Sequence, residues 1–299
     1  MITLLAGSNA LRHVGLKAYL QASRDHAIAL SDLTLVEMRK SKALATSRES
    51  VRIAAQFPTQ LFVLRRTDQI LDEHVTCEAA THALFDYDET IQFAALCRRL
   101  QTLPPPPGLA EEMAEHEANA RLIMSRLADQ VAELEPGLVN AARDFTQAEL
   151  TQIRTVQHIE DSTRRKLLDL LKQTTGSFIL QNQDPGRRAP MLLRDAMGLF
   201  AFRYSLCMLL YYMEWVRVGR TVGKNLPRRV NDVVDMQIAA MGTFFNGVLS
   251  ADDNLQIVSN TARRVLRGFG AYVGTDWRPP QPPDTDDGAS PDARAADPR

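Results

Sequence analysis

The chain has 299 residues, of which 45% are hydrophobic, so it can bury a large core and is not disordered throughout. Its 35 basic residues nearly balance its 36 acidic residues. A surface that binds nucleic acid must therefore be a local patch and not a property of the whole chain. The three cysteines, Cys77, Cys97 and Cys207, are too scattered for a zinc knuckle or a disulfide framework, which favours a reducing cytoplasm.

Two stretches of the sequence, the N-terminus and residues 197–216, bear on membrane association. The N-terminus has no basic region before a long apolar run, so we do not expect a signal peptide. The most apolar stretch, residues 197–216, contains Arg203 and Glu214 and has no uninterrupted apolar run of about 18 residues. It predicts a buried helix and no membrane partner.

The first part of the chain alternates between strand and helix signals. Apolar runs at residues 2–6 and 26–30 predict buried strands, and residues 61–64 predict a third. Helices are expected at residues 10–22 and from about Leu33, the second capped by Ser31 or Asp32. This alternation is typical of an α/β fold with a parallel sheet.

Strand signals are absent from the middle of the sequence. A helix is predicted at residues 87–100, and four prolines at 104–107 must interrupt it. A long helix with an apolar stripe from Met113 to Leu134 is expected to end at Pro136 and Gly137. A partner helix with a stripe from Leu150 to Leu171 could fold back on it as an antiparallel hairpin. This segment is predicted to be an inserted helical module.

The last part of the chain returns to mixed signals. An apolar helix to about Arg217 precedes a basic connector at residues 217–229, and a second helix is predicted at residues 231–245. A short strand at residues 248–250 comes next, and Asp252 or Asp253 can cap a final helix at residues 255–267. From residue 278 onward the chain is rich in proline and poor in large apolar side chains, which predicts disorder.

Three acidic residues adjoin these predicted strands. Glu37 lies in the helix after the second strand, Asp235 lies in the helix before the last strand, and Asp252 follows that strand at once. In a parallel α/β fold, residues just beyond the carboxyl ends of the strands converge on one rim. The three carboxylates could therefore share a divalent cation.

The segments that carry these acids resemble the PIN-like domain family of metal-dependent nucleases. Residues 30–38 are similar to the family segment in which a threonine is followed three residues later by an acid, here Thr34 and Glu37. Residues 235–240 resemble its Asp-Ala-x-Ile-Ala-Ala helix, and residues 249–252 resemble a strand that ends in Thr-x-Asp, with Ser250 in place of threonine. The first family motif, Asp-x-Asn, is incomplete because Gly7 stands where the aspartate is expected, although Asn9 is kept.

The resemblance implies a discontinuous domain. Residues 1–80 and 190–277 would form a PIN-like α/β domain with a small parallel sheet, interrupted by a helical insertion at residues 81–189 and followed by a disordered tail at residues 278–299. The insertion would recognise substrate or a protein partner.

The resemblance also implies an activity, that of a ribonuclease dependent on Mg²⁺ or Mn²⁺, with RNA as the expected substrate and DNA as an alternative. Glu37, Asp235 and Asp252 would bind the metal, since such hard cations prefer oxygen ligands. Residues that could support the metal ligands are Asn9, Asp232, Ser250 and Asp253. Residues that could contact phosphate are Arg39, Lys40, Lys224, Arg228 and Arg229.

Simpler interpretations stay open. Glu37 precedes Arg39 and Lys40 and could occupy a solvated helix position, and Asp252 could be only a helix cap. Because Gly7 removes one acid, the domain could be an inactive module that binds RNA or another protein. A third alternative is a helical interaction protein in which the motif matches are accidental.

Overall fold

The computed structural model describes residues 1–71, 73–155, 159–182, 193–219 and 226–277. The predicted tail and Lys224 lie outside these residues. One sheet of five strands lies at the centre, in the order β4-β3-β2-β1-β5. All neighbouring strands are parallel except β3 and β4. The strands are β1 (Ile2–Ala6), β2 (His26–Leu30), β3 (Leu61–Leu64), β4 (Phe85–Asp86) and β5 (Val248–Leu249).

The sheet confirms the α/β fold class and the four predicted strands. β1 pairs with β5, so the two ends of the chain meet in one sheet. The antiparallel strand β4 was not predicted, because two residues are too few for a periodic signal. Strands β1 and β2 are almost fully buried along their length, as expected for parallel strands that are covered on both faces.

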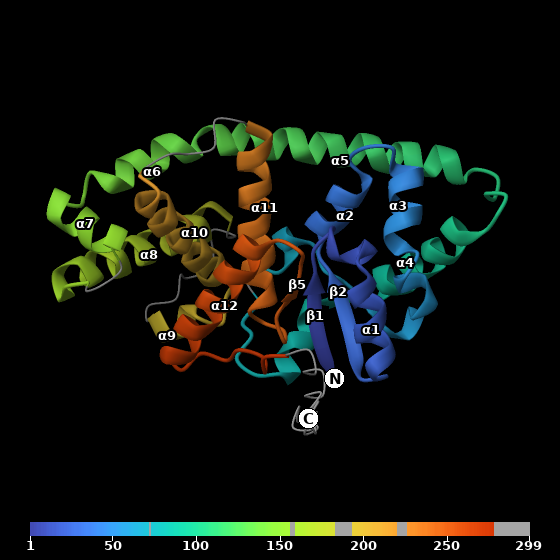
Figure 1. Ribbon diagram of the computed structural model, residues 1–299, viewed down its shortest axis with the longest axis horizontal. Helices are drawn as coiled ribbons and strands as arrows, with labels where there is room; N and C mark the ends of the chain where they lie inside the picture. Colours follow the sequence, from blue (N-terminus) through green and yellow to red (C-terminus); the bar gives the residue numbers. More distant parts are fainter. Residues whose placement is uncertain (72, 156–158, 183–192, 220–225, 278–299) are drawn as a thin grey trace, which may run out of the picture.

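The described residues form twelve α-helices, which cover the two faces of the sheet and extend to one side of it (Figure 1). The first six are α1 (Val14–Ala22), α2 (Asp32–Arg39), α3 (Ala43–Val51), α4 (Tyr87–Gln101), α5 (Leu109–Ala132) and α6 (Leu134–Ala142). The others are α7 (Gln147–Thr155), α8 (Asp161–Asn182), α9 (Leu193–Ala196), α10 (Phe200–Arg217), α11 (Leu226–Gly242) and α12 (Asp253–Gly268). None of the helices within the described ranges is long and apolar enough to cross a membrane.

Alternate residues of each strand enter different cores. Leu4 and Ala6 of β1 pack in a core with α1, α3 and α4, whereas Leu5 packs in a second core with α10, α11 and α12. In β2, Ile28 lies in the first of these cores and Ala29 lies in the second. This alternation follows from the two-residue period of a strand and gives a three-layer arrangement of helix, sheet and helix.

Three helix boundaries differ from the predictions. The first predicted helix is divided at His13, whose extended backbone separates a 3-10 turn (Ala10–Arg12) from α1 and whose ring accepts a hydrogen bond from the backbone N–H of Gly15. The long helix ends at Ala132, before the predicted end at Pro136. Pro136 lies instead in the first turn of the next helix, α6. Proline is tolerated there, since a first-turn residue has no intrahelical N–H bond to lose. Helix α11 begins at Leu226 and ends at Gly242, earlier at both ends than predicted.

The middle of the chain shares its packing with the sheet. Phe93 of α4 and Met113 of α5 lie in the core with α1, and Leu127 of α5 lies in the core with α11. The predicted partner helix is two helices, α7 and α8, and both pack against α10 in a third core. Figure 1 shows α5 extending across the top of the molecule above α2, α3 and α11. The division of the chain at residues 81 and 189 stays a prediction.

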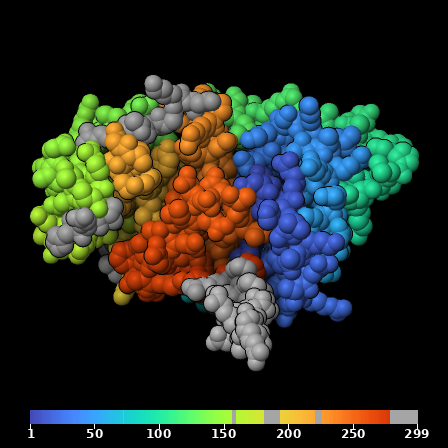
Figure 2. Space-filling model, viewed as in Figure 1, coloured from blue at the N-terminus to red at the C-terminus, as the bar shows by residue number. Residues whose placement is uncertain are grey.

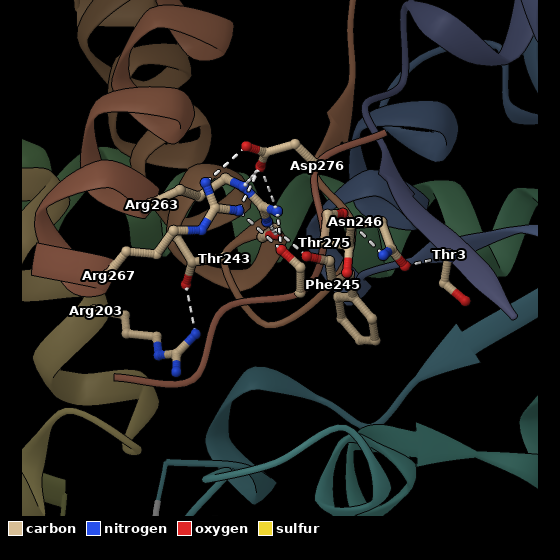
Figure 3. Close-up of polar contacts among 11 residues, drawn as sticks. Thr3, Arg203, Thr243, Phe245, Asn246, Arg263, Arg267, Thr275 and Asp276 are labelled. Atoms are coloured by element: carbon tan, nitrogen blue, oxygen red, sulfur yellow. Dashed lines mark hydrogen bonds and ion pairs between the residues drawn. The ribbon is translucent and has the colours of Figure 1, made fainter. Parts of the chain in front are cut away.

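Buried arginines hold the last described segment, residues 271–277, which we call the C-terminal strap. Arg263, 1% exposed, donates to the carbonyl oxygens of Gly242, Phe245 and Gly274 and also binds Asp276. Arg203 donates to the carbonyl oxygen of Tyr272. Figure 3 shows Arg263 and Arg267 converging on Asp276, with Asn246 linking the strap to Thr3 of β1. The strap thereby fixes the amino end of β1, far from the candidate site described next.

Candidate functional site

The carboxyl ends of β1 and β5 form the point where the topology of the sheet reverses. From β1 the chain passes through α1 to β2 on one side, whereas β5 arrives on the other side after α11. Loops at such a switch point diverge and leave a crevice in which α/β proteins bind ligands. Figure 2 shows the N-terminal segment, in blue, lying directly beside the orange and red C-terminal segment on the face of the molecule that is in view.

Backbone and side-chain hydrogen bonds join the loops after β1 and β5. The N–H of Gly7 donates to the carbonyl oxygen of Leu249 at 2.9 Å. The Asn9 Oδ1 atom accepts from Ser250 Oγ and from the N–H of Ala251, each at 3.3 Å. Ser250 Oγ also accepts from the N–H of Asp252 at 3.0 Å. Asn9 and Ser250 therefore hold the two loops together and position Asp252.

Asp252 caps helix α12, as one of the simpler interpretations predicted. Its Oδ1 atom accepts a hydrogen bond from the N–H of Leu255 at 3.0 Å. The Oδ2 atom has no hydrogen bond to any described residue, so it is available to a ligand. Asp253 is exposed in the first turn of α12 and its carboxylate bonds to none of the described residues.

Glu37 lies in α2, the helix that follows β2. Its carboxylate is largely covered, with 15% of the side chain exposed, and accepts a hydrogen bond from Ser8 Oγ at 2.7 Å. Lys40 Nζ lies 3.8 Å from its other oxygen. Thr34, one turn earlier, is fully buried and donates to the carbonyl oxygen of Ala6. Glu37 therefore faces the end of β1 and is not an ordinary solvated helix residue, while Thr34 fastens α2 to β1.

Asp235 of α11 is the acidic side chain with the most unfavourable surroundings. It is half-buried and makes no hydrogen bond or ion pair with the described residues. Burial, followed by the charges of Asp252, Glu37 and Asp232, raises its pKa to about 7. A half-buried carboxylate that lacks a partner and is repelled by three others is stabilised either by a proton or by a bound cation.

Asp232 lies one turn before Asp235. Its Oδ2 atom accepts a hydrogen bond from the Tyr211 hydroxyl at 3.0 Å. Burial raises the pKa of Asp232, and the Tyr211 hydrogen bond and the charge of Arg228 oppose that rise. Tyr211 and Ser8 are partners of the acidic residues that no sequence pattern indicated, because contacts between α10 and α11 and between β1 and α2 have no local signature.

Residue 7 lies beside these groups and has room for a side chain. A Cβ atom there would lie 3.4 Å from Asn9 Oδ1 and 3.6 Å from Ser250 Oγ, and the backbone is not left-handed. Asp32, in contrast, cannot take the place of the missing acid. Its carboxylate accepts hydrogen bonds from the N–H and hydroxyl of Thr67 and ties the end of β2 to the segment after β3.

The predicted phosphate contacts that the structure describes lie at the C-terminal end of α2 and in α11. Arg229 lies 3.5 Å from Glu135 of α6, and Arg228 is exposed near Asp232. Lys40 is close to Glu37, while Arg39 faces a separate groove bounded by α5.

The donor chemistry of the site suits a hard divalent cation, since Glu37, Asp232, Asp235 and Asp252 offer carboxylate oxygens. Within the described part of the chain, however, no group of three or more His, Cys, Asp or Glu side chains is already arranged to hold a metal ion. Asp252 uses one oxygen to cap α12, and Glu37 accepts from Ser8 with one oxygen and pairs with Lys40 through the other. Asp235 uses neither of its oxygens for a described partner. The oxygen ligands are of the type that such an ion prefers. A bound cation would stabilise Asp235 most, because that carboxylate has no described partner to offset its charge.

The fold and site define an α/β protein with acidic residues gathered at the switch point of a mostly parallel sheet. No family model, curated protein or solved structure matches this chain.

Proposed function

We propose that this protein is a PIN-like nuclease that depends on Mg²⁺ or Mn²⁺, with RNA as its expected substrate and DNA as the alternative. The observation that carries the proposal is the position of Asp235. It makes no hydrogen bond or ion pair with the described part of the chain, it is half-buried, and it is electrostatically coupled to Glu37, Asp232 and Asp252 at the switch point of the sheet. A crowded set of acids destabilises a fold unless it serves a ligand, so it is typical of a functional site.

Each acidic residue has a role in this proposal. Asp235, Asp252 and Glu37 would hold the cation, and Asp232 would support Asp235 from one turn away. A bound Mg²⁺ or Mn²⁺ supplies an activated water and offsets the negative charge that develops on the phosphoryl group. Ser8 orients Glu37, and Ser250 and the α12 cap orient Asp252. Free cysteines, Cys97 and Cys207 buried and Cys77 exposed, fit action in the cytoplasm.

The alternative is a PIN-like module that binds RNA or a protein partner without cleavage. Gly7 favours this alternative, because one acid of the family pattern is absent and Asp32 does not replace it.

One experiment separates the two functions. Thermal unfolding would be followed while Mn²⁺ or Mg²⁺ is added, and cleavage of a mixed RNA pool would be measured in parallel for wild type and Asp235→Asn. A nuclease gives metal-dependent stabilisation and cleavage, both lost in the variant. RNA binding by both proteins without cleavage by either supports the inactive RNA-binding module. If the wild type shows no RNA binding, no cleavage and no stabilisation by metal, the nuclease and the RNA-binding module are both overturned.

A further inference from the structure

A groove of about 990 Å³ lies along helix α5 and is lined by none of the four site acids Glu37, Asp232, Asp235 and Asp252. We call it the α5 groove. One wall is α5, from His116 to Gln130, and the opposite wall comes from α2 and from the segment after β3. At a rise of 1.5 Å per residue, the α5 wall is about 21 Å long. The groove is therefore large enough for a ligand of nucleotide size or for several units of a chain.

Unpaired hydrogen-bond donors face this groove. Arg39 of α2 lines the groove and makes no hydrogen bond or ion pair with the described residues, and its guanidinium lies over the ring of Phe93, 6.0 Å from the ring centroid. Arg126 of α5 likewise has no partner among them, and neither does Asn119. A partly buried guanidinium without a hydrogen bond is costly, and burial lowers the pKa of Arg39. The groove thus offers donor groups from which no described residue accepts a hydrogen bond.

Most acidic groups of the groove are already engaged. Asp32 accepts from Thr67, Asp68 pairs with Arg66, and Asp86 caps α4 through the N–H of Glu89. The exception is the carboxyl group of Glu89, which faces Arg39 without forming an ion pair within 4 Å; burial raises its pKa. The charged groups of the groove without a hydrogen bond or ion pair to a described residue are therefore Arg39, Arg126 and Glu89, and the two guanidinium groups can bind an anionic ligand rich in acceptors.

The groove also has an apolar component. Leu33 and Val36 of α2 and Ile123 of α5 line it between the polar ends. Planar guanidinium groups match phosphoryl oxygens in a two-point geometry, and apolar surface suits a base or sugar.

We propose that the α5 groove binds a phosphorylated ligand of nucleotide size, with Arg39 and Arg126 as its two cationic contacts. This site is distinct from the carboxylate site, which lies at β1 and β5, while the groove lies beyond β2 and β3. The same phosphoryl chemistry could come from a free nucleotide or from the phosphorylated end of an RNA strand. The proposal stands whether or not the protein is a nuclease.

The test is calorimetric titration of the full chain in EDTA, which removes divalent cations from the carboxylate site. The probes are ATP and a uridine tetranucleotide with and without a 5′-phosphate. We expect ATP or the phosphorylated tetranucleotide to bind and the unphosphorylated one to bind at least about tenfold more weakly. Binding of ATP alone identifies a free nucleotide, and binding of the tetranucleotide alone identifies a strand end.

Matched variants locate the binding. Arg39→Gln and Arg126→Gln should each weaken it by about tenfold or more. Arg121→Gln removes the same charge from an exposed position of α5 outside the groove and should leave binding unchanged. Asp235→Asn should also bind like wild type, so a failure of the nuclease proposal would leave this result intact. Arg126 is exposed, so its replacement tests the groove even if the Arg39 variant folds poorly. No binding by wild type, or binding by both groove variants that equals binding by wild type, would overturn the proposal.

Discussion

The amide oxygen of Asn9 accepts a hydrogen bond from the Ser250 hydroxyl at 3.3 Å, although 241 residues separate the two in sequence. Asn9 follows β1 and Ser250 follows β5, so this contact closes the candidate site from opposite ends of the chain. The acidic residues around this contact each have a different set of protein partners. A substitution of one residue can therefore test the role of that residue alone.

Replacement of Asp235 by asparagine should stabilise the protein when no metal is present. The folded pKa of Asp235 is about 7 and its ordinary value is 3.8, so the folded state holds the proton more tightly. Stability of the wild type is therefore lost as pH rises from about 4 through 7. We expect Asp235→Asn to gain on the order of 1–3 kcal/mol at pH 8 and much less at pH 5. Urea denaturation at both pH values measures this, and an equal effect at the two would contradict the assignment.

Replacement of Asp252 separates its role as a cap from its charge. Asparagine caps helices about as well as aspartate, so Asp252→Asn should keep the stability of α12 while weakening Mn²⁺ binding and cleavage. Asp252→Ala should in addition lose about 1 kcal/mol of unfolding free energy. Thermal unfolding with and without Mn²⁺ distinguishes these outcomes. If the asparagine variant binds Mn²⁺ as the wild type does, Asp252 is only a cap.

Introduction of an acid at position 7 should strengthen the metal site. Gly7→Asp places a carboxylate near Asn9 and Ser250, where a side chain meets ordinary contact distances. We expect tighter Mn²⁺ binding and created or increased cleavage, since an anionic ligand is added. Gly7→Asn has nearly the same shape without the charge and serves as the control. Mn²⁺ titration of both folded variants decides the matter, and equal affinities would show that residue 7 does not face a metal.

Removal of the Tyr211 hydroxyl should affect Asp232. Tyr211→Phe deletes a hydrogen bond that lowers the pKa of Asp232, so that pKa should rise further. Unfolding free energy should fall by about 1 kcal/mol. The shift in Asp232 can be followed by NMR titration of its side-chain carboxyl carbon. An unchanged titration would show that the hydrogen bond does not form in solution.

Arg263 should be indispensable to the C-terminal strap. Arg263→Met removes the donor of the Phe245 carbonyl oxygen, removes one of the two donors of each of the Gly242 and Gly274 oxygens, and leaves Asp276 with Arg267 alone. We expect a loss of roughly 3 kcal/mol in unfolding free energy. The neighbouring Arg264→Met is the matched control, because Arg264 is exposed and, among the described residues, its side chain bonds to Thr261 alone. Similar stability of the two variants would contradict the role of the network.

The sequence alone determined the elements with strong local signals. The strands at residues 2–6 and 26–30 are apolar on both faces, and Ser31 and Asp252 cap the helices that follow β2 and β5, as their positions indicated. The same reasoning placed Glu37, Asp235 and Asp252 near strand ends, since parallel strands share one rim. Their electrostatic coupling is consistent with that placement.

Only the tertiary structure decided which groups of the protein contact each acidic residue. Asp32 and Asp232 are both acidic residues that could have replaced an acid at position 7, yet Asp32 is engaged by Thr67 and Asp232 is held by Tyr211 near Asp235. Likewise Glu37 and Arg39 are two residues apart, but they face different sites because α2 separates the carboxylates from the α5 groove. Local patterns fix the period and the ends of an element. The partner of each side chain depends on contacts between segments up to 241 residues apart, which form only when the elements pack.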